Sequence, residues 1–415
     1  MSPATYRANA FTEAGARIGL ELVRATDLPP ELATHWHVAL GIDFSQPEAA
    51  LERIVAVARD ETAAPVLAVL AIDDRGALIA AQASVILGLS HNDPGSALAA
   101  RDKFLMRERL TGAGVPVPEY RRYPASTDPV TVAAAVADAI AYPCVVKPLL
   151  LSGSRGVIRA DDPAQFVAAF ARTRRIVEAS GMAAAANDIL VERFVPGPEV
   201  ALEGLLTDGT LTTLALFDKP DPLDGPFFEE TIYVTPSRLP HDIQAAVSAR
   251  AAAAAAAVGL RHGPVHVELR IDLDRGEIWT IELAGRSIGG LCSSVLEFGA
   301  GVNLEELILR HAARLPLHSL ELAADAAGVM MIPIPRGGIL RRVDGIDGAL
   351  AVDGVTGVEI TAPLNGPIVP LPEGESYLGF IFAKAETPAL AEAALREAHA
   401  RLTFRIDPMI TLIPA

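Results

Sequence analysis

The chain is poor in cysteine, in aromatic residues and in positive charge. Its 415 residues include two cysteines, Cys144 and Cys292, and 5% aromatic residues. Two cysteines cannot build a disulfide framework or a cysteine-rich zinc site, so we expect two buried free thiols. The 51 acidic residues outnumber the 35 basic ones and give a net charge of −16. This balance argues against a nucleic-acid-binding protein, which needs a basic face.

Long apolar runs are also missing. Residues 1–17 lack the apolar centre of a secretory signal, and no stretch reaches the roughly 18 apolar residues of a membrane span. The alanine run at 251–257 favours a helix instead. We therefore expect a cytoplasmic protein that binds no membrane. Apolar residues nevertheless make up 51% of the chain, enough for about two to four domain cores at this length.

Residues 1–95 alternate helical and strand patterns, which predicts a small parallel α/β domain. Helical spacing covers Ala10 to Val23 and Leu78 to Leu89, with an end at Gly88, and Pro65–Ala71 has the composition of a buried strand. The chain opens directly in the first helix. Either the domain lacks its first strand or the chain starts late.

The rest of the chain predicts a second unit and then an α+β unit. We expect helices over 100–113, 130–140, 163–180 and 245–258, and strands over 144–147, 189–193, 265–271 and 277–283. Segment 199–235 is rich in strand patterns, and the part from about 325 mixes strands with a helix at 388–401. The fold class is therefore α/β and α+β.

The first candidate site is a strand that ends at Lys147 and runs into a loop of small residues, Ser152, Gly153, Ser154 and Gly156. Small residues let backbone N–H groups approach phosphate oxygens, and a lysine adds a point charge. The loop is not a Walker loop, because no Gly-Lys-Ser/Thr opens a helix. An ordinary turn beside a surface lysine is the alternative.

Two pairs of glutamates are the other candidates. Glu192 and Glu199 flank a Pro-Gly turn after a strand, where they could accept hydrogen bonds from a nucleotide or simply be solvated. Glu268 and Glu282 lie in adjacent apolar strands, and Arg286 follows. Carboxylates on buried strands are costly unless they are paired or bound to a cation, and Mg²⁺ prefers such oxygens. The alternative for this pair is an exposed hairpin.

The order of these motifs resembles the ATP-grasp superfamily over nearly the whole chain. ARDK at 100–103, the lysine before the loop, the glutamate hinge and two acidic strands ending in E-x-x-x-R follow one another. IELAGRSIGG at 281–290 and PLPEGESYLGFIFAKAE at 370–386 are similar to the L-amino-acid ligases of the bacilysin-dipeptide type.

The resemblance implies an ATP-grasp fold in three parts. These are an N-terminal α/β domain (1–95), an ATP-grasp domain (96–320) and a C-terminal α+β domain (321–415). Within the second part, the nucleotide lid covers about 120–200 and the metal-binding lobe about 200–320.

The resemblance also implies how ATP is bound. Lys103 and Lys147 contact the phosphates, and Ser152 to Gly156 form a flexible phosphate loop that closes as a lid. Glu192, with the backbone of Arg193 to Val195, holds adenine, and Glu199 holds the ribose.

For the metal, the resemblance implies that Glu268 and Glu282 bind Mg²⁺, for which Mn²⁺ can substitute. Arg286 and His266 stabilise the transferring phosphoryl group and the tetrahedral intermediate. Many ATP-grasp enzymes carry Asn where this chain has Ala284, which leaves the number of metal ions open.

The implied activity is the ATP-dependent joining of a carboxylate to an amine through an acyl phosphate. The substrates would be small molecules, amino acids in particular, the products ADP, phosphate and an amide or dipeptide, and a homodimer is compatible with this reading. A bicarbonate-activating enzyme like biotin carboxylase is one alternative, although the chain has no Met-Lys-Met biotin-attachment segment. A degenerate ATP-binding regulatory subunit is the other. Retention of Lys147, Glu268, Glu282 and Arg286 together favours catalysis.

Overall fold

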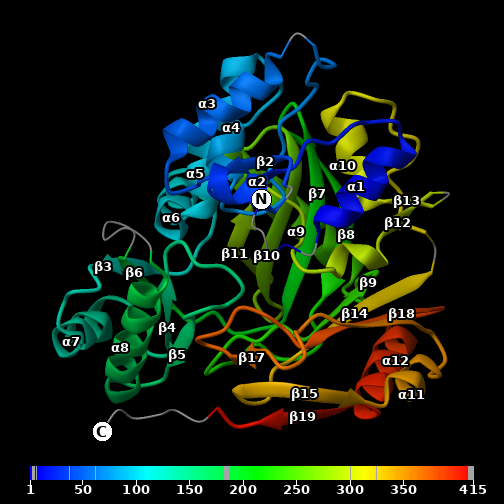
Figure 1. Ribbon diagram of the computed structural model, residues 1–415. Helices are drawn as coiled ribbons and strands as arrows, with labels where there is room; N and C mark the ends of the chain where they lie inside the picture. Colours follow the sequence, from blue (N-terminus) through cyan, green and yellow to red (C-terminus); the bar gives the residue numbers. More distant parts are fainter. Residues whose placement is uncertain are drawn as a thin grey trace, which may run out of the picture.

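The structure is a computed structural model that describes residues 1, 5, 7–36, 38–60, 62–181, 187–299, 301–323 and 325–409. Its centre is an antiparallel sheet of eight strands in the order β11-β10-β7-β8-β9-β14-β18-β16. N-terminal helices lie above one end of this sheet, a smaller sheet with its own helices lies beside it, and the C-terminal helices lie at the other end (Figure 1). No helix in the described ranges is both long and apolar enough to cross a membrane.

The N-terminal part confirms the predicted α/β character. Its elements are α1 (Ala8–Arg17), β1 (Ala25–Asp27), α2 (Pro30–His35), β2 (Leu40–Ile42), α3 (Pro47–Ala58), α4 (Ala77–Leu87) and α5 (Pro94–Arg101). Strands β1 and β2 pair in parallel. Helix α4 ends at Gly88, whose φ of 67° suits a residue without a side chain.

Two predictions in this part are wrong. Helix α1 ends at Arg17 rather than near Val23, because Gly19 adopts φ 71° and turns the chain out of the helix. Pro65–Ala71 is neither a strand nor buried, and the side chain of Leu67 is 52% exposed. An apolar run becomes a strand only where a neighbouring strand takes up its backbone hydrogen bonds, and the described β1–β2 pair does not extend to this segment.

The single helix expected over 100–113 is two helices, α5 and α6 (Lys103–Gly112), which meet at Asp102. Asp102 is extended (φ −88°, ψ 111°), and its carboxylate accepts hydrogen bonds from the N–H groups of Phe104 and Leu105. An aspartate at this position caps the new helix and stops the old one. The break sends the chain in a new direction between Arg101 and Lys103.

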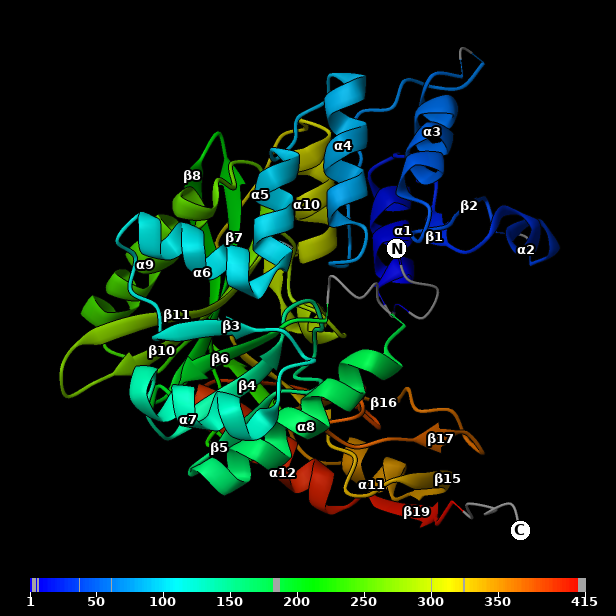
Figure 2. The same cartoon turned by 90° about the vertical axis from the view of Figure 1, so that its left-hand side faces the viewer.

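The smaller sheet has the order β3-β6-β4-β5 and confirms the predicted elements closely. Its strands and helices are β3 (Tyr120–Tyr123), α7 (Pro129–Ala139), β4 (Cys144–Pro148), β5 (Ile158–Ala160), α8 (Pro163–Ala179) and β6 (Ile189–Arg193). The two helices lie together on one side of the sheet (Figure 2). Aspartates at 128 and 162 cap α7 and α8, each followed by a proline at the first helical position.

The first strands of the large sheet carry most of the candidate residues. They are β7 (Glu199–Thr207), β8 (Thr210–Asp218), β9 (Ile232–Thr235), β10 (Gly263–Asp272) and β11 (Glu277–Ala284), with α9 (His241–Val258) between β9 and β10. The alanine run lies in α9, where Ala251, Ala254 and Ala255 are completely buried against the sheet and α6. Small side chains allow this close helix-to-sheet contact.

The C-terminal part continues the same sheet, because β14 pairs with β9. Its elements are η2 (Cys292–Val295), β12 (Glu297–Phe298), β13 (Val302–Asn303), α10 (Leu304–Ala312), β14 (Ala326–Ile332), β15 (Gly338–Asp344), α11 (Ile346–Leu350), β16 (Val355–Ile360), β17 (Pro367–Ile368), β18 (Gly379–Ala385), α12 (Pro388–Ala400) and β19 (Thr403–Asp407). The mixture confirms the α+β character. Both cysteines are free and buried, as expected.

Candidate functional site

A narrow cleft of about 70 Å³ lies between the small sheet and the first strands of the large one. Ten of the residues singled out in the sequence line it, namely Lys103, Lys147, Ser152, Ser154, Glu192, Arg193, Val195, Glu199, Glu268 and Glu282. We call it the acidic cleft. Residues separated by almost 180 positions in the chain thus meet at one place.

Lys147 stands on β4 and is held by Glu192 of the neighbouring strand β6. Its Nζ lies 2.7 Å from the Glu192 carboxylate, which also accepts from Nε of Arg107 at 2.5 Å. Burial alone would raise the pKa of Glu192, but Arg107 and Lys147 outweigh it and lower the pKa to about 2. Glu192 is 1% exposed, and its two carboxylate oxygens contact Arg107 and Lys147 respectively.

Lys103 enters the cleft from the start of α6. Its Nζ donates to the carbonyl oxygen of Leu151 at 2.8 Å and lies 3.8 Å from a carboxylate oxygen of Glu282. The loop after β4 is therefore tied to this lysine, and both predicted phosphate-binding lysines line the same cleft.

The small-residue loop after β4 contacts both the acidic cleft and the C-terminal part of the chain. Gly153, Ser154 and Gly156 have φ values of 61°, 55° and 74°, and a side chain on Gly156 would meet the Pro148 ring at 2.7 Å. Ser152 and Ser154 face the cleft. The N–H of Gly156 instead donates to the carbonyl of Pro372 at 2.8 Å, so this part of the loop rests on the C-terminal part of the chain.

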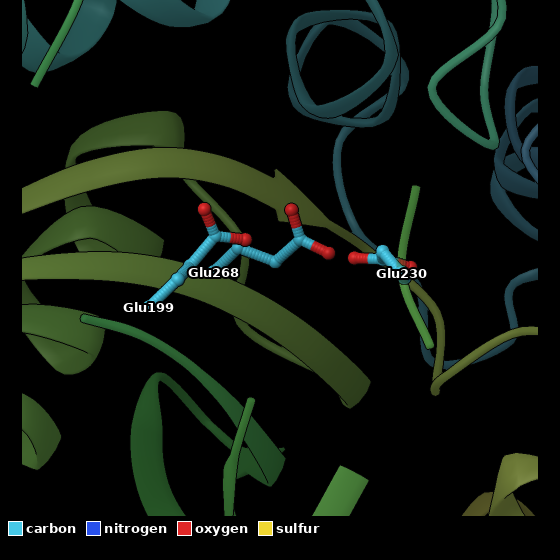
Figure 3. Close-up of side chains that lie close together, drawn as sticks. All are labelled: Glu199, Glu230 and Glu268. Carbon is cyan, nitrogen blue, oxygen red and sulfur yellow. The ribbon is translucent and has the colours of Figure 1, made fainter. Parts of the chain in front are cut away.

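A lysine absent from the sequence predictions lies among three carboxylates in the cleft. Nζ of Lys219 lies 2.7 Å from Glu199, 2.5 Å from Glu230 and 3.2 Å from Glu268. The carboxylates of Glu230 and Glu268 point toward each other, and that of Glu199 lies on the other side of Glu268 (Figure 3). Arg270 holds the second oxygen of Glu199 at 2.8 Å.

The charges in this cluster are only partly balanced. Burial, together with the negative charges of Glu268 and Glu199, raises the pKa of Glu230 to about 7 against the attraction of Lys219. Glu268 behaves oppositely: burial is outweighed by Lys219 and His266, and its pKa falls well below the usual range. Three hard oxygen ligands with their oxygens within 4.8 Å of one another suit an additional cation such as Mg²⁺.

Glu268 and Glu282 are direct cross-strand partners on β10 and β11. Residues opposite each other on antiparallel strands point to the same face of the sheet, which confirms the predicted juxtaposition. Glu268 is mostly buried, whereas the side chain of Glu282 is 33% exposed. The pair therefore offers one fixed carboxylate and one that remains open to the cleft.

His266 lies beneath this pair rather than in the cleft lining. One ring nitrogen contacts a carboxylate oxygen of Glu203 and the other lies 3.3 Å from Glu268. Burial lowers the pKa of His266, but the two carboxylates outweigh it and raise the pKa to about 9. A protonated imidazole in this place fixes the orientation of Glu268.

Arg286 follows β11 and is held by the N-terminal part of the chain. Its guanidinium makes two parallel bonds to Asp74, at 2.9 and 2.8 Å. Burial would lower its pKa, but Asp74, Glu282 and Glu203 outweigh it and keep the pKa above its ordinary value. Arg286 does not line the acidic cleft itself.

Sequence reasoning missed the partners of these residues. Glu203 stands four residues after Glu199 on β7, and a period of two places both on one face, a signal that was readable. Arg107 stands four residues after Lys103 on α6, which also predicts a shared face. Lys219, Glu230 and Asp74 come from segments with no local pattern that distinguishes them.

Comparison with known families agrees with this geometry. Residues 140–295 match a model described as an ATP-grasp domain, and residues 330–407 match the L-amino acid ligase C-terminal domain 2. The L-amino acid ligase of Bacillus licheniformis superposes with a TM-score of 0.77 at 26% identity, over 96% of this chain and 95% of that one.

Curated relatives match over part of their length. The chain is 26% identical to an uncharacterised protein of Sinorhizobium fredii and 28% identical to the alanine–anticapsin ligase of Bacillus subtilis. These matches span 77% and 55% of this chain, and 64% and 50% of the relatives. The chain thus has the ATP-grasp fold, and its sequence and fold are similar to those of the L-amino acid ligases.

Proposed function

We propose that the chain is an ATP-dependent carboxylate–amine ligase that forms an amide or dipeptide through an acyl phosphate. The observation that carries the proposal is the cross-strand pair Glu268 and Glu282 in the same cleft as Lys103 and Lys147. Two carboxylates for a metal ion and two cations for phosphates are what phosphoryl transfer requires, since it depends on positioning and charge neutralisation.

The reaction proceeds in two balanced steps. A carboxylate oxygen of the acid attacks the γ-phosphorus of ATP, the bond to the β-phosphate oxygen breaks, and ADP leaves with that electron pair. The nitrogen lone pair of the amine then attacks the acyl carbon, phosphate leaves with the electrons of the C–O bond, and the amine loses a proton. The first step makes a good leaving group, which a free carboxylate lacks.

Each group in the cleft has a place in this proposal. Lys147, fixed by Glu192, and Lys103 neutralise the phosphates, while Ser152 and Ser154 face them from the loop. Mg²⁺ bound by Glu268 and Glu282 would supply further neutralisation of the phosphate oxygens. Glu199, clamped by Arg270, and the backbone from Arg193 to Val195 bind the nucleoside. Arg286, held by Asp74, would supply the guanidinium that stabilises the oxyanion.

A screen of amino-acid pairs for release of ADP and phosphate tests the proposal. We expect release that requires both an acid and an amine, together with an amide or dipeptide in stoichiometric amount. Bicarbonate- and biotin-dependent turnover would instead favour a biotin-carboxylase-like reaction. Tight ATP binding without any turnover would favour a regulatory subunit, and either result would contradict the ligase.

A further inference from the structure

A second and much larger cavity lies on the other side of the α5–α6 junction. Its volume is about 530 Å³, within the range of small-molecule sites. Alanines of α4 and α5 form much of its wall, and the end of α10 closes it. We call it the alanine-lined cavity.

Most polar groups around this cavity already have partners. Arg314 donates to the hydroxyl of Ser90 at 2.7 Å, and His311 lies 2.9 Å from the hydroxyl of Thr207. The side chain of Asn92 bonds to the backbone of His262. These contacts connect the N-terminal helices to the end of the large sheet.

Arg101 differs from these polar residues in the pairing of its side chain. Among the residues that the structure describes, no hydrogen bond or ion pair satisfies its guanidinium, and its Nε is shielded from solvent without a partner. Burial lowers the pKa of this side chain, and Asp74 counteracts that effect from a distance. The shielded N–H at Nε is costly to leave unpaired. The geometry of the guanidinium matches the two oxygens of a carboxylate.

Two residues of the cavity wall neighbour Arg286, which the proposed function places at the reaction centre. Asp74, which lines the cavity, is the same carboxylate that holds Arg286. Gly285, directly before Arg286, also lines it. Arg101 lines the alanine-lined cavity and Lys103 lines the acidic cleft, so the residues on the two sides of Asp102 serve different spaces.

We infer that the alanine-lined cavity binds the amine substrate, and that Arg101 pairs with that substrate's own carboxylate. This inference rests on the proposed ligase function. It identifies the amine as one that bears a free carboxylate, as an amino acid does, with a small or aliphatic body against the alanines. Arg101 is then a specificity-determining residue, because it distinguishes amino acids from simple amines.

Hydroxylamine provides the test, since it intercepts an acyl phosphate as a hydroxamate and has no carboxylate. For wild type and Arg101→Met, kcat/KM would be measured with L-alanine, with L-alaninamide and with hydroxylamine, using the same acid. We expect the ratio of L-alanine to hydroxylamine to fall at least about tenfold in the variant, the size of a lost charged hydrogen-bond pair. The preference for L-alanine over its amide should disappear with it.

Arg314→Met is the matched control, because its guanidinium lies in the same cavity wall but is already bonded to Ser90. It should keep the wild-type ratio. If Arg101→Met does not fold, Arg101→Lys should still lower the ratio a few-fold, since a point charge replaces the planar fork.

The possible outcomes test the role of Arg101 separately from the ligase function. An unchanged ratio in a folded Arg101 variant would overturn the inference while hydroxamate formation by wild type sustains the ligase. A wild-type enzyme that makes neither hydroxamate nor amide would overturn both. An equal loss with all three nucleophiles would place Arg101 in acid activation and contradict its assignment to the amine.

Discussion

The acidic cleft and the alanine-lined cavity receive Lys103 and Arg101 from the two sides of Asp102, yet their charged side chains differ in how they are paired. In the cleft, Lys147, Lys219 and Arg270 all contact buried carboxylates, and little free volume remains. The cavity has ample volume, and Arg101 has no hydrogen-bond or ion-pair partner among the residues that the structure describes. Under the proposed function, the cleft holds its charges in fixed positions for a nucleotide, whereas the charge of Arg101 is paired by the amine substrate.

This difference predicts that substitutions in the cleft change chemistry and stability, whereas those in the cavity change the choice of substrate. The largest effect is expected from Glu282→Gln. Its side chain is 33% exposed and lies 3.8 Å from Lys103, its one ion-pair partner within the described ranges, so the amide should fold normally. We expect kcat to fall at least about a hundredfold, because a metal ligand contributes several kcal/mol of charge stabilisation.

Titrating the turnover of this variant with Mg²⁺ is the measurement. Glu277→Gln, an exposed position at the start of the same strand, is the control and should behave as wild type. Normal Mg²⁺ dependence in Glu282→Gln would show that this carboxylate is structural.

Lys219→Met tests how much the ion pairs around Lys219 contribute to the free energy of unfolding. The change leaves Glu199, Glu230 and Glu268 without their shared cation, and a broken buried ion pair costs about 3–5 kcal/mol. Urea unfolding measures the loss. Lys384→Met removes a half-exposed pair with Glu297 and should cost at most about 1 kcal/mol. Equal costs for the two variants would remove the contrast between the buried cleft and an ordinary surface pair.

Glu192→Gln tests the contribution of a second buried carboxylate, through the pH dependence of the free energy of unfolding. The pKa of Glu192 is depressed from 4.5 to about 2, so the charged form contributes stability that is complete above pH 4.5 and is lost as pH falls toward 2. Linkage puts that contribution at about 3 kcal/mol. The difference in unfolding free energy between wild type and variant should therefore shrink below about pH 4.5. A difference independent of pH would contradict the role of Glu192 as the counter-ion of Lys147.

The smallest effect is expected where the small sheet touches the C-terminal part. Arg172 on α8 makes two bonds to Glu373, at 2.7 and 2.8 Å, next to the contact between Gly156 and Pro372. Both side chains are substantially exposed, so we expect a coupling of about 0.2–1 kcal/mol. A double-mutant cycle on the KM for ATP measures it, and the coupling should decline with added salt. Coupling above this range would mean that the contact holds the loop closed.

The sequence predicted the central region better than the N-terminal one. Strand β6 begins and ends as expected, and the pairing of Glu268 with Glu282 followed from alternation in two adjacent strands. Such local periodicity determines which face a residue occupies. Pro65–Ala71 failed because strand formation there depended on a partner that composition cannot reveal.

The partners of the candidate residues lay beyond sequence reasoning for a similar reason. Lys219 and Asp74 act through contacts with strands and turns far away in the chain, at separations set by the folded sheet order. Arg101 looked like any residue of the ARDK motif until the break at Asp102 separated it from Lys103. A motif predicts which residues belong together, whereas the fold decides which cavity each one reaches.

Isotope transfer tests the central claim most directly. The acid substrate would be labelled with ¹⁸O in its carboxylate and turned over with unlabelled ATP and amine. Attack at the γ-phosphorus predicts one ¹⁸O atom in the released inorganic phosphate, together with ADP. Label recovered in AMP, with pyrophosphate as the second product, would contradict the acyl-phosphate route.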